Sequence, residues 1–144
     1  MNRATNRVMK RGLLLFAHGA RDPRWAEPFE AVARRVRGLD AAVVVQLAFL
    51  EFMTPSLIDA GTALAAAGCG RIDVVPLFLG AGGHVRKDLP ALLAELAAAH
   101  PAVQWQLQGA IGARDSVIEA MARAAVELAD IDLATAQPAD GPHP

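Results

Sequence analysis

The chain has 144 residues, of which 53% are hydrophobic and 20% charged, and its formal net charge is −1. This length and composition indicate one globular domain with its own hydrophobic core. The balanced charge argues against nucleic acid or a membrane surface as a partner, because both require a strongly basic face. A single cysteine, Cys69, excludes an internal disulfide, and no apolar run is long enough to span a membrane. We therefore expect a cytoplasmic protein.

Short apolar runs alternate with amphipathic segments along the chain. The apolar runs predict four buried strands, at residues 12–17, 41–50, 71–80 and 102–108. Pro76 lies inside the third run and has no N–H to donate. The third strand must therefore bulge at this residue or leave one acceptor unpaired.

Capping residues and apolar spacing predict a helix after each strand. Asp22 caps the first helix, Thr54 caps the second, and the third covers residues 86–99. Ser116 and Glu119 form a capping box for the fourth helix. That helix is expected to bury one apolar side, made of Val117, Ile118, Met121, Ala125 and Leu128.

The alternation of strands and helices predicts an α/β fold. We expect a four-stranded parallel sheet, flanked by helices on both faces, with the flavodoxin-like strand order 2-1-3-4. Residues 12–130 would form this single domain, after a flexible N-terminus at residues 1–11. Residues 131–144 are rich in Pro, Ala and Gly and are expected to be a disordered tail.

Three polar side chains follow successive strands of the predicted sheet. His18 ends the first strand, Glu51 ends the second, and His84 follows the glycines after the third. They are spaced 33 residues apart, about one strand-helix unit, so the chain returns each of them to the same edge. Two imidazoles and a carboxylate suit a divalent first-row transition metal, and an imidazole also suits proton abstraction.

The sequence around this edge carries glycines and cations. Gly82 and Gly83 leave room for a large flat ligand, because no Cβ stands in its way. Arg21, Arg86 and Lys87 would lie at the rim and could pair with carboxylates. The same residues could instead serve a metal carrier or sensor without catalysis, or a flavin- or nucleotide-binding module. Nucleotide binding is the weaker reading, because the chain lacks a P-loop and a GxGxxG after the first strand.

The segments "LLLFAHGARDP", "AFLEFMTPSL" and "VVPLFLGAGGHVRKDLP" resemble the sirohydrochlorin chelatases. These class II chelatases insert cobalt or iron into a reduced tetrapyrrole without ATP. The resemblance runs from about residue 12 to about residue 130 and matches the short, single-lobe form, so it implies a homodimer. One departure is Ala20, where the family often has Ser after the "HG" pair.

The resemblance also implies roles for the residues of the edge. His18 and His84 match the family's metal-site histidines, and one of them would accept pyrrole protons as a catalytic base. Glu51 matches the acidic ligand more loosely. Arg21, Arg86 and Lys87 would hold the carboxylates of sirohydrochlorin, and Gly82 and Gly83 would admit its ring. The metal, Co²⁺ or Fe²⁺ and possibly Ni²⁺, would be a substrate and not a permanent cofactor, and the product would feed cobalamin or sirohaem synthesis.

Overall fold

A computed structural model describes residues 9–80 and 82–131, except for the side chains of His84 and Arg86. The chain divides into two compact units, Met1–Gly112 and Ala113–Pro144. The predicted domain over residues 12–130 spans the boundary between the units and stays a prediction. The predicted tail, apart from residue 131, and residues 1–8 of the predicted flexible N-terminus lie outside the described residues. None of the helices among the described residues is long and apolar enough to cross a membrane.

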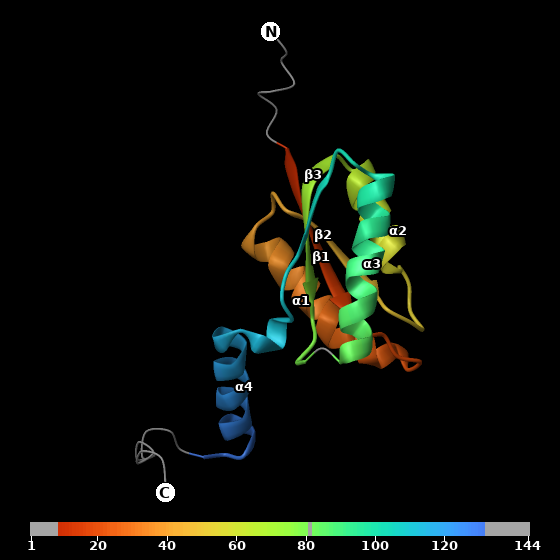
Figure 1. Cartoon of the computed structure of the whole chain (residues 1–144). Helices are drawn as coiled ribbons and strands as arrows, with labels where there is room; N and C mark the ends of the chain where they lie inside the picture. Colours follow the sequence, from red (N-terminus) through yellow and green to blue (C-terminus); the bar gives the residue numbers. More distant parts are fainter. Residues whose placement is uncertain (1–8, 81, 132–144) are drawn as a thin grey trace, which may run out of the picture. The chain divides into compact units, whose positions relative to one another are not determined.

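The first unit is built on one parallel sheet (Figure 1). Its strands are β1 (Lys10–Ala17), β2 (Val44–Phe49), β3 (Cys69–Pro76) and β4 (Gln104–Leu107). They lie in the order β2-β1-β3-β4, and every pair of neighbours is parallel. The predicted fold class and strand order are confirmed.

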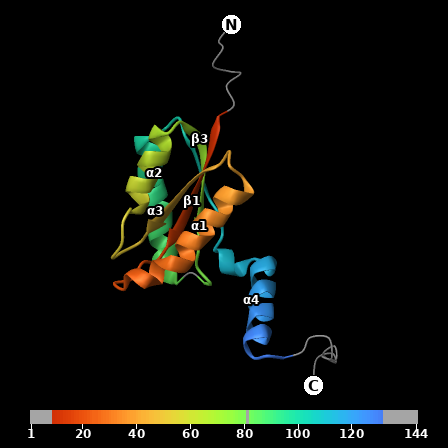
Figure 2. The same ribbon diagram turned by 180° about the vertical axis from the view of Figure 1, so that it is seen from behind.

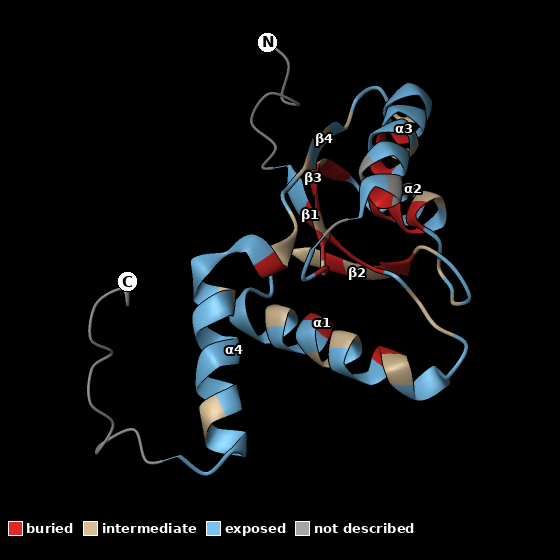
Figure 3. Ribbon diagram, turned by 60° about the horizontal axis from the view of Figure 1, so that its bottom comes forward, coloured by how far each residue is buried: buried red, intermediate tan, exposed pale blue. Residues whose placement is uncertain are grey.

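Helices cover both faces of this sheet (Figures 1 and 2). Helix α1 (Glu27–Leu39) lies on one face, and α2 (Leu57–Ala66) and α3 (Gly83–Ala99) lie on the other. The larger core cluster lies between the sheet and α2 and α3, and the buried positions concentrate on the strands (Figure 3). Its most buried large side chains are Phe16, Leu14, Leu64, Ile72, Leu96 and Val74.

The strands differ from the prediction mainly at their ends. β1 begins at Lys10 because the long cations at its start find partners: Lys10 Nζ donates to the Ala67 carbonyl at 3.2 Å, and Arg11 pairs with Asp73 at 2.8 Å. β2 and β4 are shorter than predicted at both ends, and β3 begins at residue 69 and ends at residue 76. The carboxyl ends of β1 and β2 lie within a residue of their predicted positions.

Pro76 is accommodated because it is the last residue of β3. The next residue, Leu77, donates its N–H to the Phe16 carbonyl of β1, so the nitrogen of Pro76 faces the opposite edge of its strand. Pairing with β4 on that edge has already ended at Val74 and Leu107. The missing N–H therefore falls beyond the ladder, and the strand needs no bulge at this point.

The starts of the first two helices differ from the prediction. Asp22 does act as a cap, but of a short 3₁₀ helix (Pro23–Ala26) that precedes α1. Ser56 caps α2 in place of Thr54, and its Oγ accepts from the N–H of Asp59 at 3.1 Å. Thr54 was the wrong choice because the Pro55 carbonyl accepts from Phe49 N–H, which keeps this segment extended beside β2.

Helix α3 starts at Gly83, three residues before its predicted beginning. The cause is Val85, which is 6% exposed and packs in the same core cluster as Leu89. The apolar spacing of four residues thus begins one turn earlier than the leucines alone indicate.

The second unit contains helix α4 (Asp115–Leu128), whose start and environment differ from the prediction. Its N-cap is Arg114 and no side chain bonds there, so the predicted capping box of Ser116 and Glu119 is wrong. No residue of α4 is buried, and Met121 is 41% exposed. The amphipathic pattern marks an apolar side correctly, but α4 is the only helix described in this unit and has no other helix there to pack on.

Candidate functional site

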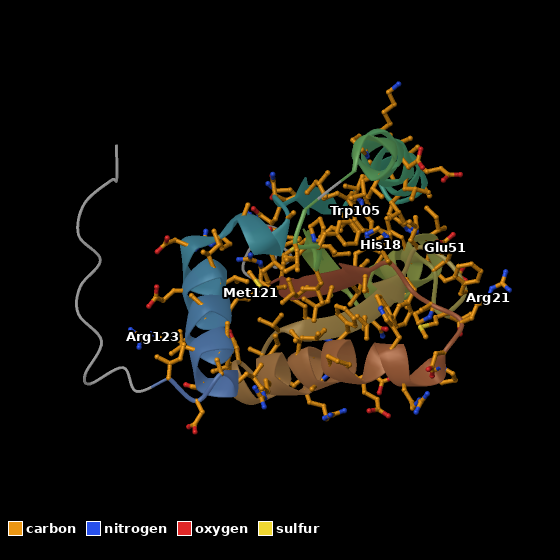
Figure 4. The ribbon with its side chains drawn as sticks, turned by 90° about the horizontal axis from the view of Figure 1, so that it is seen from below. His18, Arg21, Glu51, Trp105, Met121 and Arg123 are labelled. Atoms are coloured by element: carbon orange, nitrogen blue, oxygen red, sulfur yellow. The ribbon has the colours of Figure 1, made fainter. Side chains whose placement is uncertain are left out.

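His18 and Glu51 lie next to each other at the carboxyl edge of the sheet. His18 follows β1 directly, and Glu51 comes two residues after β2. Two backbone hydrogen bonds continue the pairing of these strands into the loops: Leu50 N–H donates to the Ala17 carbonyl at 2.9 Å, and Glu51 N–H donates to the His18 carbonyl at 3.0 Å. Figure 4 looks onto this edge and shows both side chains there, with Arg21 farther out. The predicted convergence of these two residues is confirmed.

Gly19 allows the two loops to approach this closely. Its φ is +88°, a left-handed conformation that side chains rarely adopt. A Cβ at this position would also overlap the backbone carbonyl oxygen of Glu51. Glycine is therefore required at this position for two reasons: its φ is unfavourable for other residues, and the backbone of Glu51 leaves no space for a Cβ.

The imidazole of His18 rests on an aromatic ring from the third strand's loop. The ring centroids of His18 and Phe78 are 4.2 Å apart with 31° between their planes. Phe78 is only 2% exposed, and its carbonyl accepts from Gly112 N–H at 2.8 Å. A buried and anchored Phe78 fixes the position of one face of the imidazole, and this support was not foreseen from the sequence.

The side chains of His18 and Glu51 are both exposed. Neither makes a hydrogen bond or ion pair with another described residue. Their donor atoms therefore remain available to a ligand. No group of three His, Cys, Asp or Glu side chains within the described part of the chain is arranged to hold a metal ion. The third predicted ligand, His84, lies in the first turn of α3, and its side chain is outside the described set.

The glycines of the β3–α3 loop border open space. An added Cβ at Gly80, Gly82 or Gly83 would meet no described atom within 4 Å, and none of the three has a left-handed φ. Unlike Gly19, they are required neither by backbone conformation nor by packing against described atoms. That Gly82 and Gly83 leave room for a ligand stays a prediction.

Two of the three predicted cations, Arg21 and Lys87, have described side chains. Arg21 is exposed, and its guanidinium carbon lies 5.0 Å from the centroid of the Phe52 ring. Lys87 is exposed on α3, and the side chain of Arg86 lies outside the described set. The structure thus confirms exposure for Arg21 and Lys87, while their contact with a ligand stays a prediction.

A pocket of about 350 Å³ lies beside Arg21, between the loops after β1 and β2 and the start of α1. Its lining includes two aromatic residues, Phe49 and Phe52, and Met53, which packs against the core cluster that contains Ala26 and Phe49. Phe52 is 58% exposed and has a φ of 64°. Sequence reasoning missed this pocket, and its only signal was the apolar pair that directly follows Glu51.

A second polar cluster lies in the middle of the sheet and surrounds Asp73 of β3. Its carboxylate accepts from Arg11 at 2.8 Å, from Gln108 at 2.9 Å and from Arg71 at 3.3 and 3.4 Å. Burial raises the pKa of Asp73, but the hydrogen bonds from Arg71, Gln108 and Arg11 outweigh burial and hold that pKa below its ordinary value of 3.8. Every acceptor here is used internally, so the cluster is structural.

A family model matches most of the chain. The model of the CbiX family matches residues 12–128. The sirohydrochlorin cobaltochelatase of Methanosarcina acetivorans is 34% identical over 84 residues, which cover 58% of this chain and 65% of that protein. The match therefore spans slightly less than two thirds of the length of this curated relative.

The comparison with solved structures also finds a CbiX protein and a sirohydrochlorin chelatase. A cobalamin (vitamin B12) biosynthesis CbiX protein from Marinobacter aquaeolei VT8 is 33% identical with a TM-score of 0.73, covering 83% of this chain and 98% of that one. The sirohydrochlorin chelatase SirB from Bacillus subtilis subspecies spizizenii, in complex with cobalt, is 26% identical with a TM-score of 0.73, covering 84% and 52%. The TM-scores show that both share the fold of this chain. With a family model that matches most of its residues, the chain belongs to the CbiX family.

Proposed function

We propose that this protein is a lyase that inserts a divalent metal ion, Co²⁺ or Fe²⁺, into sirohydrochlorin without ATP. The observation that carries the proposal is the pair of His18 and Glu51, whose backbones are hydrogen-bonded to each other and whose side chains make no hydrogen bond or ion pair with a described residue. A relative with the name sirohydrochlorin cobaltochelatase and a SirB complex with cobalt support cobalt as the first metal to test.

The metal would first bind to the protein's own ligands. A neutral imidazole nitrogen of His18 and a carboxylate oxygen of Glu51 suit a first-row divalent ion, and His84 would supply a second imidazole. So small a ligand set leaves open positions on the ion, unlike a closed structural site with four protein ligands. The ion can therefore pass to the tetrapyrrole as a substrate.

Insertion also requires proton transfer. A divalent ion that binds four ring nitrogens displaces two pyrrole N–H protons, and an acceptor must take each of them. An imidazole titrates near neutral pH and suits this role. His18 contacts Phe78 through its ring and is exposed, so the nitrogen that releases the ion to the tetrapyrrole can accept one of these protons, and the second would pass to His84 or to solvent.

The tetrapyrrole would bind across the same edge. The space beside Gly82 and Gly83 would admit the ring, and Arg21, Arg86 and Lys87 would pair with its carboxylates. The proposal includes a homodimer, because the match spans about half of the SirB chain and a second copy would supply the other half. It assumes a cytoplasmic reaction that feeds cobalamin or sirohaem synthesis, and Ni²⁺ is a third metal to test.

The testing experiment is an anaerobic metal-insertion assay. The protein is mixed with sirohydrochlorin and Co²⁺, Fe²⁺ or Ni²⁺, and the visible spectrum is followed against protein-free controls. His18→Ala should lower the rate by about 100-fold or more. His100→Ala is the matched control, because His100 lies at the other end of α3 and should leave the rate unchanged.

The alternative function is a metal carrier or sensor without catalysis. It would use the same His and Glu ligands but would need no space for a macrocycle, so the open glycine loop argues against it. Rates equal to the protein-free controls for all three metals, together with Co²⁺ binding that His18→Ala abolishes, would replace the chelatase proposal with this one.

A further inference from the structure

We infer that the pocket beside Arg21 holds one carboxylate-bearing side chain of the tetrapyrrole, and that Phe52 is the residue that positions Arg21 for this contact. The inference rests on the proposed function and names a part of the substrate site that lies on the α1 side of the edge.

The pocket has the size and lining of a partial ligand site. Its volume of about 350 Å³ lies at the lower end of the roughly 300–1,000 Å³ of small-molecule sites, so it suits an edge of a macrocycle better than the whole ring. Its lining is apolar where it is most buried, at Ala26 and Phe49, which are 5% and 6% exposed. The charged groups at its boundary are Arg21 and Glu30.

Phe52 holds a position that core packing does not explain. Its φ of 64° is the left-handed conformation, which is uncommon for a residue with a Cβ and for a bulky one above all. Its ring is nevertheless 58% exposed, so the strained backbone does not serve to bury the side chain. Strain that persists without a packing benefit is typical of positions that a ligand uses.

With this backbone conformation, the ring of Phe52 lies next to the guanidinium group of Arg21. The guanidinium carbon lies 5.0 Å from the ring centroid, within the range of a cation–π contact. A contact with the ring takes up none of the guanidinium N–H groups in a hydrogen bond to an oxygen acceptor. No hydrogen bond or ion pair from Arg21 reaches another described residue, so the planar donor fork can receive a carboxylate with two hydrogen bonds.

The neighbouring acids do not neutralise Arg21. Asp22 is the adjacent residue, but its carboxylate pairs with Arg24 at 3.0 Å. Glu30 lines the same pocket and would repel an incoming carboxylate, so the acid group would bind toward Arg21 and its apolar stem toward Phe49 and Met53. Since Arg21 is three residues after His18 and Phe52 directly follows Glu51, one substrate edge held here would bring the ring to the metal ligands.

The test is a double-mutant cycle on tetrapyrrole binding without metal. Dissociation constants for sirohydrochlorin are measured from its absorbance for the wild type, Arg21→Ala, Phe52→Leu and the double variant, with Co²⁺ affinity measured separately. We expect roughly a tenfold weakening for Arg21→Ala and about fivefold for Phe52→Leu. Co²⁺ affinity should not change, because neither residue is a proposed metal ligand. Leu39→Ala, at an 86% exposed position at the end of α1, is the control.

The decisive prediction is that the double variant binds no more weakly than Arg21→Ala alone, because Phe52 acts through Arg21. Phe52→Trp should retain wild-type affinity, since it offers a better ring face to the cation. If Phe52→Leu fails to fold, Arg21→Lys replaces it, because it keeps the charge and removes the planar fork, and it should weaken binding.

Effects of Arg21 and Phe52 that multiply in the double variant would overturn the inference, as would wild-type affinity in Phe52→Leu. Both results are compatible with a wild-type protein that inserts cobalt, so the proposed function would survive them. A wild-type protein that neither binds sirohydrochlorin nor accelerates metal insertion would instead overturn the proposed function and the inference together.

Discussion

The sheet carries two groups of polar side chains, and they differ in whether their hydrogen-bonding atoms are used. In the middle of the sheet, Asp73 accepts from Arg11, Arg71 and Gln108 and lies buried in β3. At the carboxyl edge, the side chains of His18 and Glu51 are exposed and bond to no described residue.

The difference separates groups that stabilise the fold from groups that serve a ligand. A buried carboxylate must be satisfied, because an unpaired one costs several kcal/mol, and the Asp73 cluster meets that need internally. At the carboxyl edge, backbone hydrogen bonds place His18 beside Glu51, and the two side chains make no hydrogen bonds with described residues. Substitutions in each group should therefore affect different properties of the protein.

The largest effect is expected from Gly19→Ala. The new Cβ would overlap the Glu51 carbonyl in a backbone that disfavours any side chain, so we expect a loss of about 3 kcal/mol in the free energy of unfolding and a loss of metal binding. Urea denaturation and Co²⁺ titration measure the two losses. The control is Gly38→Ala, where an added Cβ meets nothing within 4 Å and should raise stability by up to about 1 kcal/mol. A stable Gly19→Ala variant that still binds Co²⁺ would show that the two loops are not fixed as described.

Asp73→Asn tests the structural cluster. The amide cannot accept from three donors as a carboxylate does, so we expect a loss of about 2 kcal/mol in stability. The rate of metal insertion, measured below the melting temperature, should stay at the wild-type value. A large fall in that rate with stability unchanged would move Asp73 into the functional site.

The pH dependence of stability tests the same cluster through the protonation of Asp73. Because the folded pKa of Asp73 is lowered, its stabilising contribution is present above the ordinary value of 3.8 and is lost as the pH falls through the folded pKa. The stability of the wild type should therefore fall more steeply than that of Asp73→Asn as the pH is lowered below about 4. Equal slopes for the two proteins would contradict the lowered pKa.

Glu51→Gln should have a moderate and local effect. The side chain is exposed and has no partner among the described residues, so stability should change by no more than about 0.5 kcal/mol. The amide is a poorer metal ligand, and Co²⁺ affinity should fall about tenfold. Glu27→Gln, an exposed acid in the first turn of α1, is the matched control. Unchanged Co²⁺ affinity in Glu51→Gln would remove Glu51 from the ligand set.

Gly82→Ser should have the smallest effect. Ser is a favourable N-cap, so α3 should be as stable as before or slightly more so. The added side chain would occupy the space left for the tetrapyrrole and should raise its KM about threefold, with Co²⁺ affinity unchanged. A KM equal to that of the wild type would mean that the substrate does not approach this glycine.

Several features of the fold could be predicted because each depends on local pattern. The apolar runs gave four strands, and the connections between them gave the observed order β2-β1-β3-β4. The convergence of His18 and Glu51 followed from this topology, since parallel strands end at the same edge.

Other features depend on contacts that the sequence does not reveal. Ser56 caps α2 in place of Thr54 because residues 55 and 56 pair with β2, which is a tertiary contact. The apolar side of α4 was recognised, but the spacing of apolar residues cannot say what covers it. The support of His18 by Phe78 and the left-handed φ of Phe52 likewise arise from how distant loops pack.

The central claim is that the unused side chains at the carboxyl edge form the metal site. Adding Co²⁺ in small steps to isotope-labelled protein and following its NMR spectrum tests this claim directly, because the paramagnetic ion broadens the resonances nearest to it. The account predicts that signals of His18 and Glu51 broaden first, while those of Asp73 and Gln108 stay sharp until much higher Co²⁺ concentrations. Broadening that begins at Asp73, or that spreads evenly over the exposed acids, would contradict it.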